Sequence, residues 1–153
     1  MRVSAKVDYA VRAALELAAA DNDGAPIKGD RIAEAQKIPL KFLENILSEL
    51  RRAGIVGSQR GAEGGYWLAK PAASVSIADI IRAVEGPLAD VHGTPPEKLK
   101  FTGPAKPLKE VWVAARAGLR SVLDEVTLAD VVAGDLPPVV ADLVASKGAW
   151  SRR

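Results

Sequence analysis

Residues 37–70, KIPLKFLENILSELRRAGIVGSQRGAEGGYWLAK, decide the fold of this chain. Between Pro39 and Ala53, apolar residues recur at three- and four-residue steps, which predicts an amphipathic helix. Its expected core stripe consists of Leu43, Ile46, Leu47 and Leu50. Gly54 follows directly and predicts the end of the helix, because glycine adopts a positive φ without strain.

A β-hairpin is expected after this helix. Ile55–Arg60 and Tyr66–Lys70 have the composition of short strands, and Gly61-Ala-Glu-Gly-Gly65 lies between them. This connection is too long for a two-residue turn, so we expect a longer loop at the tip of the hairpin. From Lys37 to Arg60 there are five basic residues against two acidic ones. A helix followed by a basic, glycine-tipped hairpin is the layout of a winged helix-turn-helix domain.

Two further helices are predicted before this stretch. Ser4 can cap a helix whose apolar face carries Val7, Val11, Ala14, Leu15 and Ala18. Residues 21–24 are polar and predict a turn, and Ile27 can lie in an extended segment. A short helix is expected from Gly29 to Gln36, with a turn over residues 37–39. Pro39 suits the first position of the next helix, since its missing N–H needs no partner there.

Capping-box patterns at Ser76 and Thr127 predict the starts of two more helices. Between them lies a loop over residues 86–104 that is rich in proline and glycine. A long amphipathic helix follows, at about residues 105–125, and a last short one is expected at 139–146. The fold class is therefore mainly α with a small β-hairpin wing (α+β). We divide the chain into a winged helix-turn-helix domain (1–86), a loop (87–104), and a long helix with C-terminal helices (105–146).

Composition excludes several functions. The 153 residues include one histidine and no cysteine, so disulfides, thiolate catalysis, zinc fingers and cysteine-ligated iron–sulfur clusters are excluded. No nucleophile–base pair is recognisable, and we expect no enzyme activity, metal or cofactor. No apolar run reaches the roughly 18 residues of a membrane span. Charged residues interrupt the N-terminal stretch at helical spacing, so it predicts a helix and not a signal peptide, and a cytoplasmic location is expected.

The predicted winged helix points to double-stranded DNA as the partner, since a helix fits the major groove and exposes polar side chains to base edges. Glu44 can accept from cytosine and Asn45 can pair with adenine, while Arg60 can enter a narrow minor groove. The candidate DNA-binding residues are Ser4, Lys6, Lys28, Lys41, Phe42, Glu44, Asn45, Ser48, Arg51, Arg60, Gly61, Gly64, Gly65 and Tyr66. Two alternatives stay open: an ordinary solvated helix face, and an interaction module that no longer binds DNA.

Four segments together resemble a known family: MRVSAKVDYAVRAALELA, IPLKFLENILSELRRAGIVGSQRGAEGGYWLAKP, SIADIIRAVEG and TLADV. They are similar to the Rrf2-type bacterial transcription regulators, which include IscR, NsrR and CymR. The resemblance implies a homodimer, most simply a repressor, that binds a partly palindromic operator through its winged helices. It also implies that the long helix builds the dimer interface; the alternative is an intrachain core helix. The expected interface residues are Leu108, Val111, Trp112, Ala115, Leu119, Val122 and Leu123.

The loop departs from the family pattern. Many relatives carry three cysteines there that bind an iron–sulfur cluster, and this chain has none. We therefore expect regulation by an unknown small molecule or a partner protein. A ligand pocket is expected between the first helix, the loop and the long helix, near Trp112. Asp8 lies where some relatives supply an oxygen ligand, and His92 is the loop's histidine; ordinary surface roles are expected for both.

Overall fold

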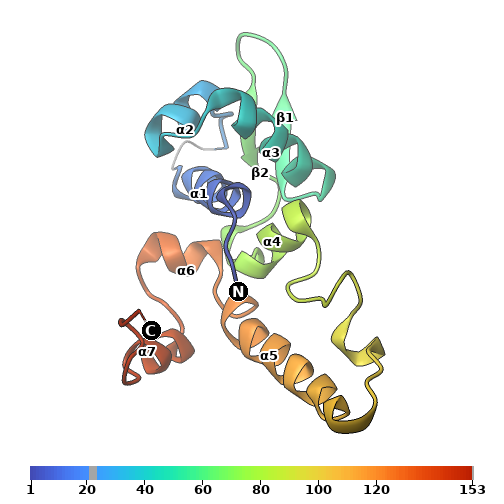
Figure 1. Cartoon of the computed structure of the whole chain (residues 1–153). Coiled ribbons are helices and arrows are strands. Elements are labelled where there is room, and N and C mark those ends of the chain that lie inside the picture. The colour runs from blue at the N-terminus through green and yellow to red at the C-terminus, as the bar shows by residue number, and fades with distance from the viewer. Residues whose placement is uncertain (21–23, 153) are drawn as a thin grey trace.

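The computed structural model of the chain describes residues 1–20 and 24–152, and all but the last residue of the turn expected at residues 21–24 lies outside them. Within this part, the chain forms seven α-helices and one small hairpin, which lies at one end of the molecule (Figure 1). Their bounds are α1 Ala5–Ala19, α2 Gly29–Gln36, α3 Leu40–Arg52, β1 Val56–Gln59, β2 Gly65–Leu68, α4 Ile77–Glu85, α5 Leu108–Leu123, α6 Leu128–Ala133 and α7 Pro138–Val144. The mainly helical class with a two-stranded wing is confirmed.

The hydrophobic core lies where α1 contacts α2, α3, α4, α6 and β2. We call this part of the molecule, together with the hairpin, the head. The predicted stripe of α3 is confirmed, because Leu43, Ile46, Leu47 and Leu50 are all fully buried. The face expected for α1 is partly wrong. The buried residues are Val7, Ala10, Ala13, Ala14 and Leu17, whereas Val11, Leu15 and Ala18 are only half-buried. Several other elements pack against α1, and its small buried alanines allow this packing on more than one side of the helix.

The hairpin is tied to the segment before α2. β1 and β2 pair antiparallel from Val56↔Leu68 to Gln59↔Gly65. Ile27 and Tyr66 exchange two backbone hydrogen bonds, each 2.8 Å long, so the chain leading into α2 lies along the wing. β1 is one residue shorter than expected at each end, whereas β2 begins one residue earlier than expected and ends two residues earlier, at Leu68. Ile55 stays outside β1 because its N–H donates to Leu50 O (3.0 Å) and completes the end of α3.

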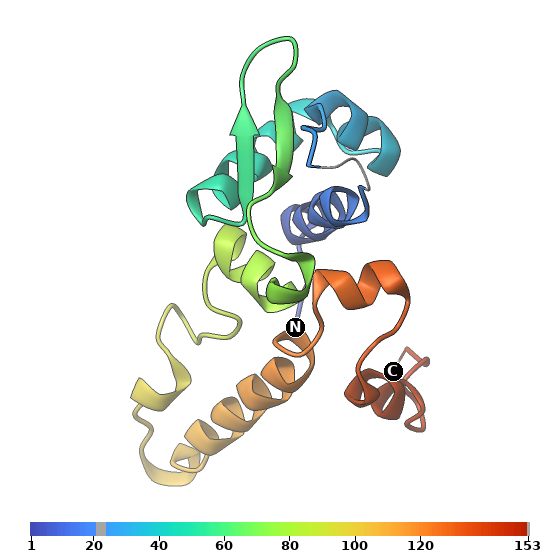
Figure 2. The same cartoon turned by 180° about the vertical axis from the view of Figure 1, so that it is seen from behind.

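Helix α5 extends away from the head, as both views of the ribbon show (Figures 1 and 2). It begins at Leu108 and not at residue 105, since Gly103–Ala105 form a 3-10 turn that contains Pro104, and Pro107 precedes the helix. The chain then returns to the head, where Ser76 and Thr127 form a β-bridge and Leu128 is fully buried. Within the described residues, no helix has both the length and the apolar character of a membrane span.

Candidate nucleic-acid interface

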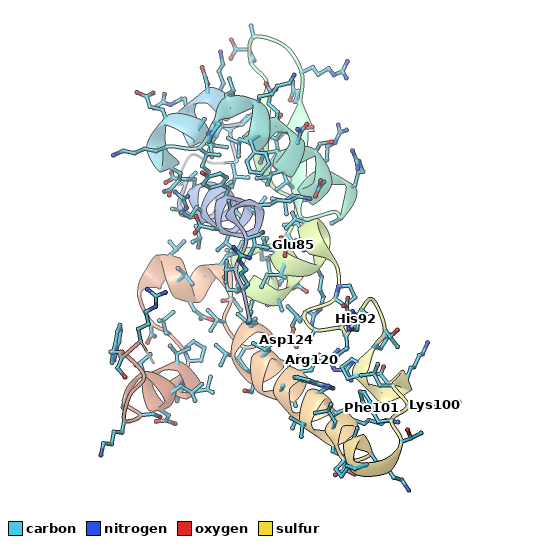
Figure 3. All side chains as sticks on the ribbon, viewed as in Figure 1. Glu85, His92, Lys100, Phe101, Arg120 and Asp124 are labelled. Carbon is cyan, nitrogen blue, oxygen red and sulfur yellow. The ribbon has the colours of Figure 1, made fainter. Side chains whose placement is uncertain are left out.

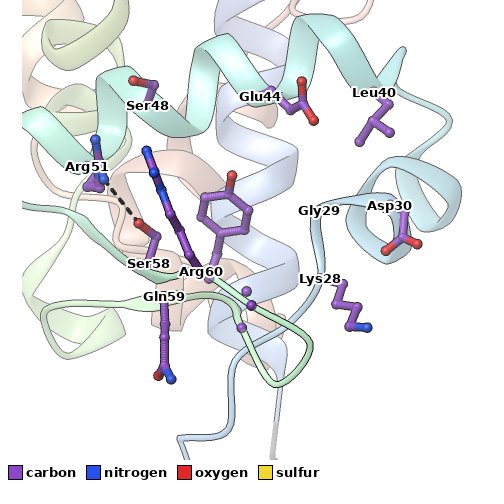
Figure 4. Close-up of a pocket in the computed structure, with 14 residues that line it drawn as sticks. Lys28, Gly29, Asp30, Leu40, Glu44, Ser48, Arg51, Ser58, Gln59 and Arg60 are labelled. Carbon is purple, nitrogen blue, oxygen red and sulfur yellow. Dashed lines mark hydrogen bonds between the residues drawn. The ribbon is translucent and has the colours of Figure 1, made fainter.

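Three elements of the head enclose an open groove of about 630 Å³ (Figure 4). They are the start of α2, the outer face of α3 and the tip of the wing. We call it the reading groove. Its lining consists of Lys28, Gly29, Asp30, Leu40, Glu44, Ser48, Arg51, Ser58, Gln59, Arg60, Gly61, Gly64, Gly65 and Tyr66. Nine of the predicted DNA-binding residues lie here: Lys28, Glu44, Ser48, Arg51, Arg60, Gly61, Gly64, Gly65 and Tyr66.

Helix α3 supplies one wall of the reading groove. Leu40, Glu44, Ser48 and Arg51 are spaced by three and four residues, so their side chains share one face of the helix. The buried stripe lies on another face, which leaves this one open to solvent. The guanidinium of Arg51 donates across the groove to the hydroxyl of Ser58 over a long 3.4 Å (Figure 4). The contact joins α3 to β1 and leaves the other nitrogens of Arg51 available to an anion.

The wing supplies the facing wall, and close backbone contacts fix its shape. A Cβ at Gly64 would lie 2.2 Å from the carbonyl oxygen of Gln59, and one at Gly65 would lie 2.5 Å from that of Ile27. These two glycines were predicted to bind DNA. In the structure it is the protein's own backbone that comes close to them. Arg60 is exposed just beyond β1, and no ion pair holds it within residues 1–20 and 24–152.

The start of α2 forms the end of the groove. A Cβ placed on Gly29 would lie 3.4 Å from Cε2 of Tyr66, which is van der Waals contact, so the Tyr66 ring packs beside the start of α2. Lys28 precedes the helix with its side chain exposed, and Asp30 accepts from the N–H of Arg31 at 2.8 Å. The sequence analysis missed Gly29, Asp30, Leu40, Ser58 and Gln59 as groove residues. Only Leu40 carried a usable signal, four residues before Glu44 on a predicted helix.

Five predicted residues lie outside the reading groove, and two of them are far from it. Ser4 accepts from Val7 N–H (3.1 Å) and donates to the carboxylate of Glu85. Lys6 Nζ lies 2.8 Å from both Val84 O and a carboxylate oxygen of Glu49. Partners on α3 and α4 therefore hold both side chains. Sequence spacing could not predict these contacts, because they join residues more than forty positions apart.

The other three, Lys41, Phe42 and Asn45, lie on solvent-exposed faces of α3 outside the groove lining. Phe42 meets the ring of Tyr9 edge-on, with ring centroids 5.6 Å apart. Arg12 in turn lies over the Tyr9 ring at 5.0 Å and pairs with Asp8 at 2.7 Å. The ion pair with Arg12 gives Asp8 a structural partner.

The loop after α4 is tied to α5 by charge. Arg116 pairs with Glu97 at 2.6 Å, and Arg82 on α4 pairs with Asp124 at 2.7 Å. The pKa of Glu97 is lowered, first by a hydrogen bond from its own backbone N–H and then by Arg116. A mostly exposed trough of about 540 Å³ lies near Trp112, where a ligand pocket was expected, between the first residues, the loop and α5. His92 lies on its rim (Figure 3).

Comparisons with known proteins agree with this architecture. The sequence profile of the Rrf2 family, described as an iron-dependent transcriptional regulator, matches residues 3–134. The chain is 51% identical over 143 residues to the Mycobacterium tuberculosis protein Rv1287, which is named as an HTH-type transcriptional regulator, covering 94% of this chain and 88% of that one. It is 38% identical over 130 residues to the HTH-type transcriptional regulator CymR of Bacillus subtilis, covering 85% of this chain and 88% of CymR.

Solved structures give the same result. The structure of B. subtilis CymR, the global cysteine regulator, superposes with a TM-score of 0.73 at 36% identity and covers 88% of this chain and 98% of that one. The structure of IscR from T. potens superposes with a TM-score of 0.70 at 36% identity and covers 88% of each chain. These relatives are regulators and not enzymes, as expected for this chain.

The family description names iron, but the residues of this chain do not fit a cysteine-ligated cluster. The sequence contains no cysteine to supply a thiolate. Across residues 1–20 and 24–152, no three histidine, aspartate or glutamate side chains gather as a metal site would require. The family match covers residues 3–134 and so includes the loop and the long helix as well as the winged-helix part, and on this ground the chain belongs to the Rrf2 family of transcriptional regulators.

Proposed function

We propose that the chain is a homodimeric repressor that binds a partly palindromic DNA operator without an iron–sulfur cluster. The observation that carries this proposal is the reading groove, where α2, α3 and the wing converge on one open face. In a winged helix-turn-helix domain the second helix of the motif enters the major groove with its N-terminal residues at base edges. Here that helix is α3, and the wing lies beside it.

The groove suits the sugar–phosphate strand that separates a major groove from the neighbouring minor groove. With α3 in the major groove and the wing tip in the minor groove, this strand runs between the helix and the wing. Lys28, Arg51 and Arg60 then neutralise phosphates, or in the case of Arg60 enter the minor groove, where negative potential is strongest. The N-terminal N–H groups of α2 add a favourable dipole. Glu44, Lys41 and Asn45 face the bases and select among them.

The exposure of α5 supports a dimer. None of its sixteen residues is buried in the single chain, and Val111 and Trp112 are 54% and 37% exposed. An amphipathic helix of this length ordinarily covers its apolar face. A second copy provides the matching surface, and a two-fold dimer presents two reading heads to a palindromic site. The expected interface residues named above on α5 all belong to this uncovered helix.

Regulation then requires an effector that changes the affinity of the dimer for its operator. Most residues that line the trough near Trp112 are apolar, which supports a small organic molecule or a partner protein as the effector. In vitro transcription from a promoter that carries the operator tests the sign of regulation. Added protein is expected to lower the amount of transcript, and an increase would make the protein an activator.

The decisive experiment is to sequence genomic fragments retained by the purified protein and to measure their affinity by fluorescence anisotropy. A dimer that makes about 6–10 phosphate contacts gives a log K against log salt slope of roughly −5 to −9. A single recurrent, partly palindromic motif with such a slope supports the proposal. No enriched DNA, together with one co-purifying protein, would favour the alternative of an interaction module instead.

A further inference from the structure

Helix α3 exposes two large apolar side chains, and both belong to its first turn. Of its six large apolar residues, Leu43, Ile46, Leu47 and Leu50 are fully buried. Leu40 and Phe42 are 43% and 38% exposed. Single exposed apolar residues are common on protein surfaces. These two lie together at the end of the helix that meets base edges in a helix-turn-helix complex.

Both side chains are held in place by their surroundings. Leu40 lines the reading groove beside the start of α2, where its Cδ1 lies 3.8 Å from a Cβ built on Gly29. Phe42 lies on the other side of the helix, where the Tyr9 ring meets it nearly perpendicularly at 82°. The guanidinium of Arg12 lies over the Tyr9 ring. Ordering the Phe42 side chain on a ligand therefore costs little conformational entropy, since packing against Tyr9 already restricts it.

Only one group in the major groove matches such side chains. The edges of adenine, guanine and cytosine there present hydrogen-bond donors and acceptors, whereas thymine also presents its C5-methyl group. We propose that Leu40 and Phe42 each select a thymine in the operator by packing against the methyl group of that base. The inference rests on the proposed function, because it assigns a base preference to the same reading head.

The position of the thymine follows from the helix. Leu40 and Glu44 share the groove-facing side of α3 and are four residues apart, which is about 6 Å along the axis. Successive bases in a strand are about 3.4 Å apart. Glu44 carries a carboxylate, which accepts from the amino group of cytosine. The thymine met by Leu40 is therefore about two base pairs from the base read by Glu44.

The test uses duplexes recovered by sequencing bound fragments, with each thymine replaced singly by deoxyuridine, which lacks only the methyl group. At one or two thymines in each half-site, the affinity of the unaltered protein is expected to fall about fourfold, the value of burying one methyl group. Leu40→Ala or Phe42→Ala is expected to bind thymine and deoxyuridine equally at its own position.

Leu143→Ala is the matched control, because Leu143 is comparably exposed, at 49%, but lies on α7. It should keep the full difference between thymine and deoxyuridine. Circular dichroism of each variant checks that the head is folded. If the selected duplex binds tightly and every deoxyuridine is neutral, the thymine inference is wrong while DNA binding stands. If no duplex is recovered, both proposals are wrong.

Discussion

Arg60 is an exposed arginine that forms no ion pair within the described chain, in contrast to three other arginines. Arg12, Arg82 and Arg116 each hold a carboxylate at 2.6–2.7 Å. Arg60 instead lies exposed at the open edge of the reading groove, just after β1. A cation without an internal partner loses nothing within the protein when it binds an external phosphate. At the scale of single residues, this is the side chain whose role is clearest to test.

We expect Arg60→Ala to weaken operator binding by about 1–3 kcal/mol without loss of the fold. The slope of log K against log salt should also become less steep by about one, since one fewer counterion is released. Fluorescence anisotropy at four salt concentrations measures both quantities. Lys147→Ala removes a positive charge from an exposed position beyond α7 and serves as the control. Equal losses in the two variants would assign the effect to net charge and not to the wing.

Gly64 shows how a single residue can be required for shape alone. A side chain there would collide with the backbone of Gln59, at 2.2 Å from its carbonyl oxygen, so the wing tip must rearrange. We expect Gly64→Ala to lower operator affinity at least tenfold and to raise amide exchange in β1 and β2. Gly118→Ala is the matched change, because its Cβ meets open space within α5. That variant should gain up to about 1 kcal/mol of helix stability and should raise the melting temperature.

At the scale of elements, the capping boxes determine where helices begin. Ser76 with Asp79 and Thr127 with Asp130 both form the complete reciprocal pair of hydrogen bonds. The two caps are also neighbours in space, since Ser76 and Thr127 form a β-bridge. The starts of α4 and α6 therefore support each other, and α6 brings Leu128 into the core of the head.

The cap of α6 predicts a dependence of stability on pH. Hydrogen bonds from the backbone N–H and then the side chain of Thr127 lower the pKa of Asp130. A carboxyl whose pKa is lower in the folded state stabilises the fold fully above its unfolded pKa, near 3.9, and loses this effect as pH falls through the folded pKa. Asp130→Asn should therefore reduce stability at neutral pH and flatten the acid limb of the unfolding curve.

Urea unfolding at a series of pH values from 7 to 3 measures this effect. Asp142→Asn is the control, because Asp142 lies exposed on α7, outside the helix's first turn. Its acid limb should remain that of the unaltered protein. The same acid limb in Asp130→Asn as in the unaltered chain would mean that the cap does not contribute to acid unfolding.

At the scale of the whole molecule, the unusual feature is a long helix, α5, of which no residue is buried. Val111 is the most exposed large apolar residue of α5, and a charge there would have to be buried in the proposed interface. We expect light scattering to give twice the 16.1 kDa chain mass for the unaltered protein. The Val111→Asp substitution should shift the measured mass toward that of a single chain. Operator affinity should fall with it, because a monomer reads only one half-site.

Val132→Asp provides the comparison, since Val132 is 44% exposed on α6 and outside the proposed interface. It is expected to remain dimeric. Both variants should keep the helical circular dichroism of the head. A Val111→Asp protein with the full dimer mass would show that α5 is not the main contact between subunits.

How much of this could be read from the sequence differs from element to element. The stripe of α3, the caps at Ser76 and Thr127 and the stop at Gly54 depend on residues within a few positions of one another. Local spacing and local hydrogen bonding determine them, and all appear in the structure as expected. The lengths of the strands and of α5 were less accurate, because element ends compete with turns formed by neighbouring prolines and helix caps.

The sequence alone thus determined the winged helical fold, the absence of thiolate ligands and most of the residues around the reading groove. Only the tertiary structure decided that Ser4 and Lys6 serve the contact of α1 with α3 and α4. It also showed that Gly64 and Gly65 accommodate the protein's own backbone, and that Leu40 faces the groove. The reason is physical: periodicity identifies which face of a helix is apolar, but the partner of a polar or small residue depends on which distant segment packs against it.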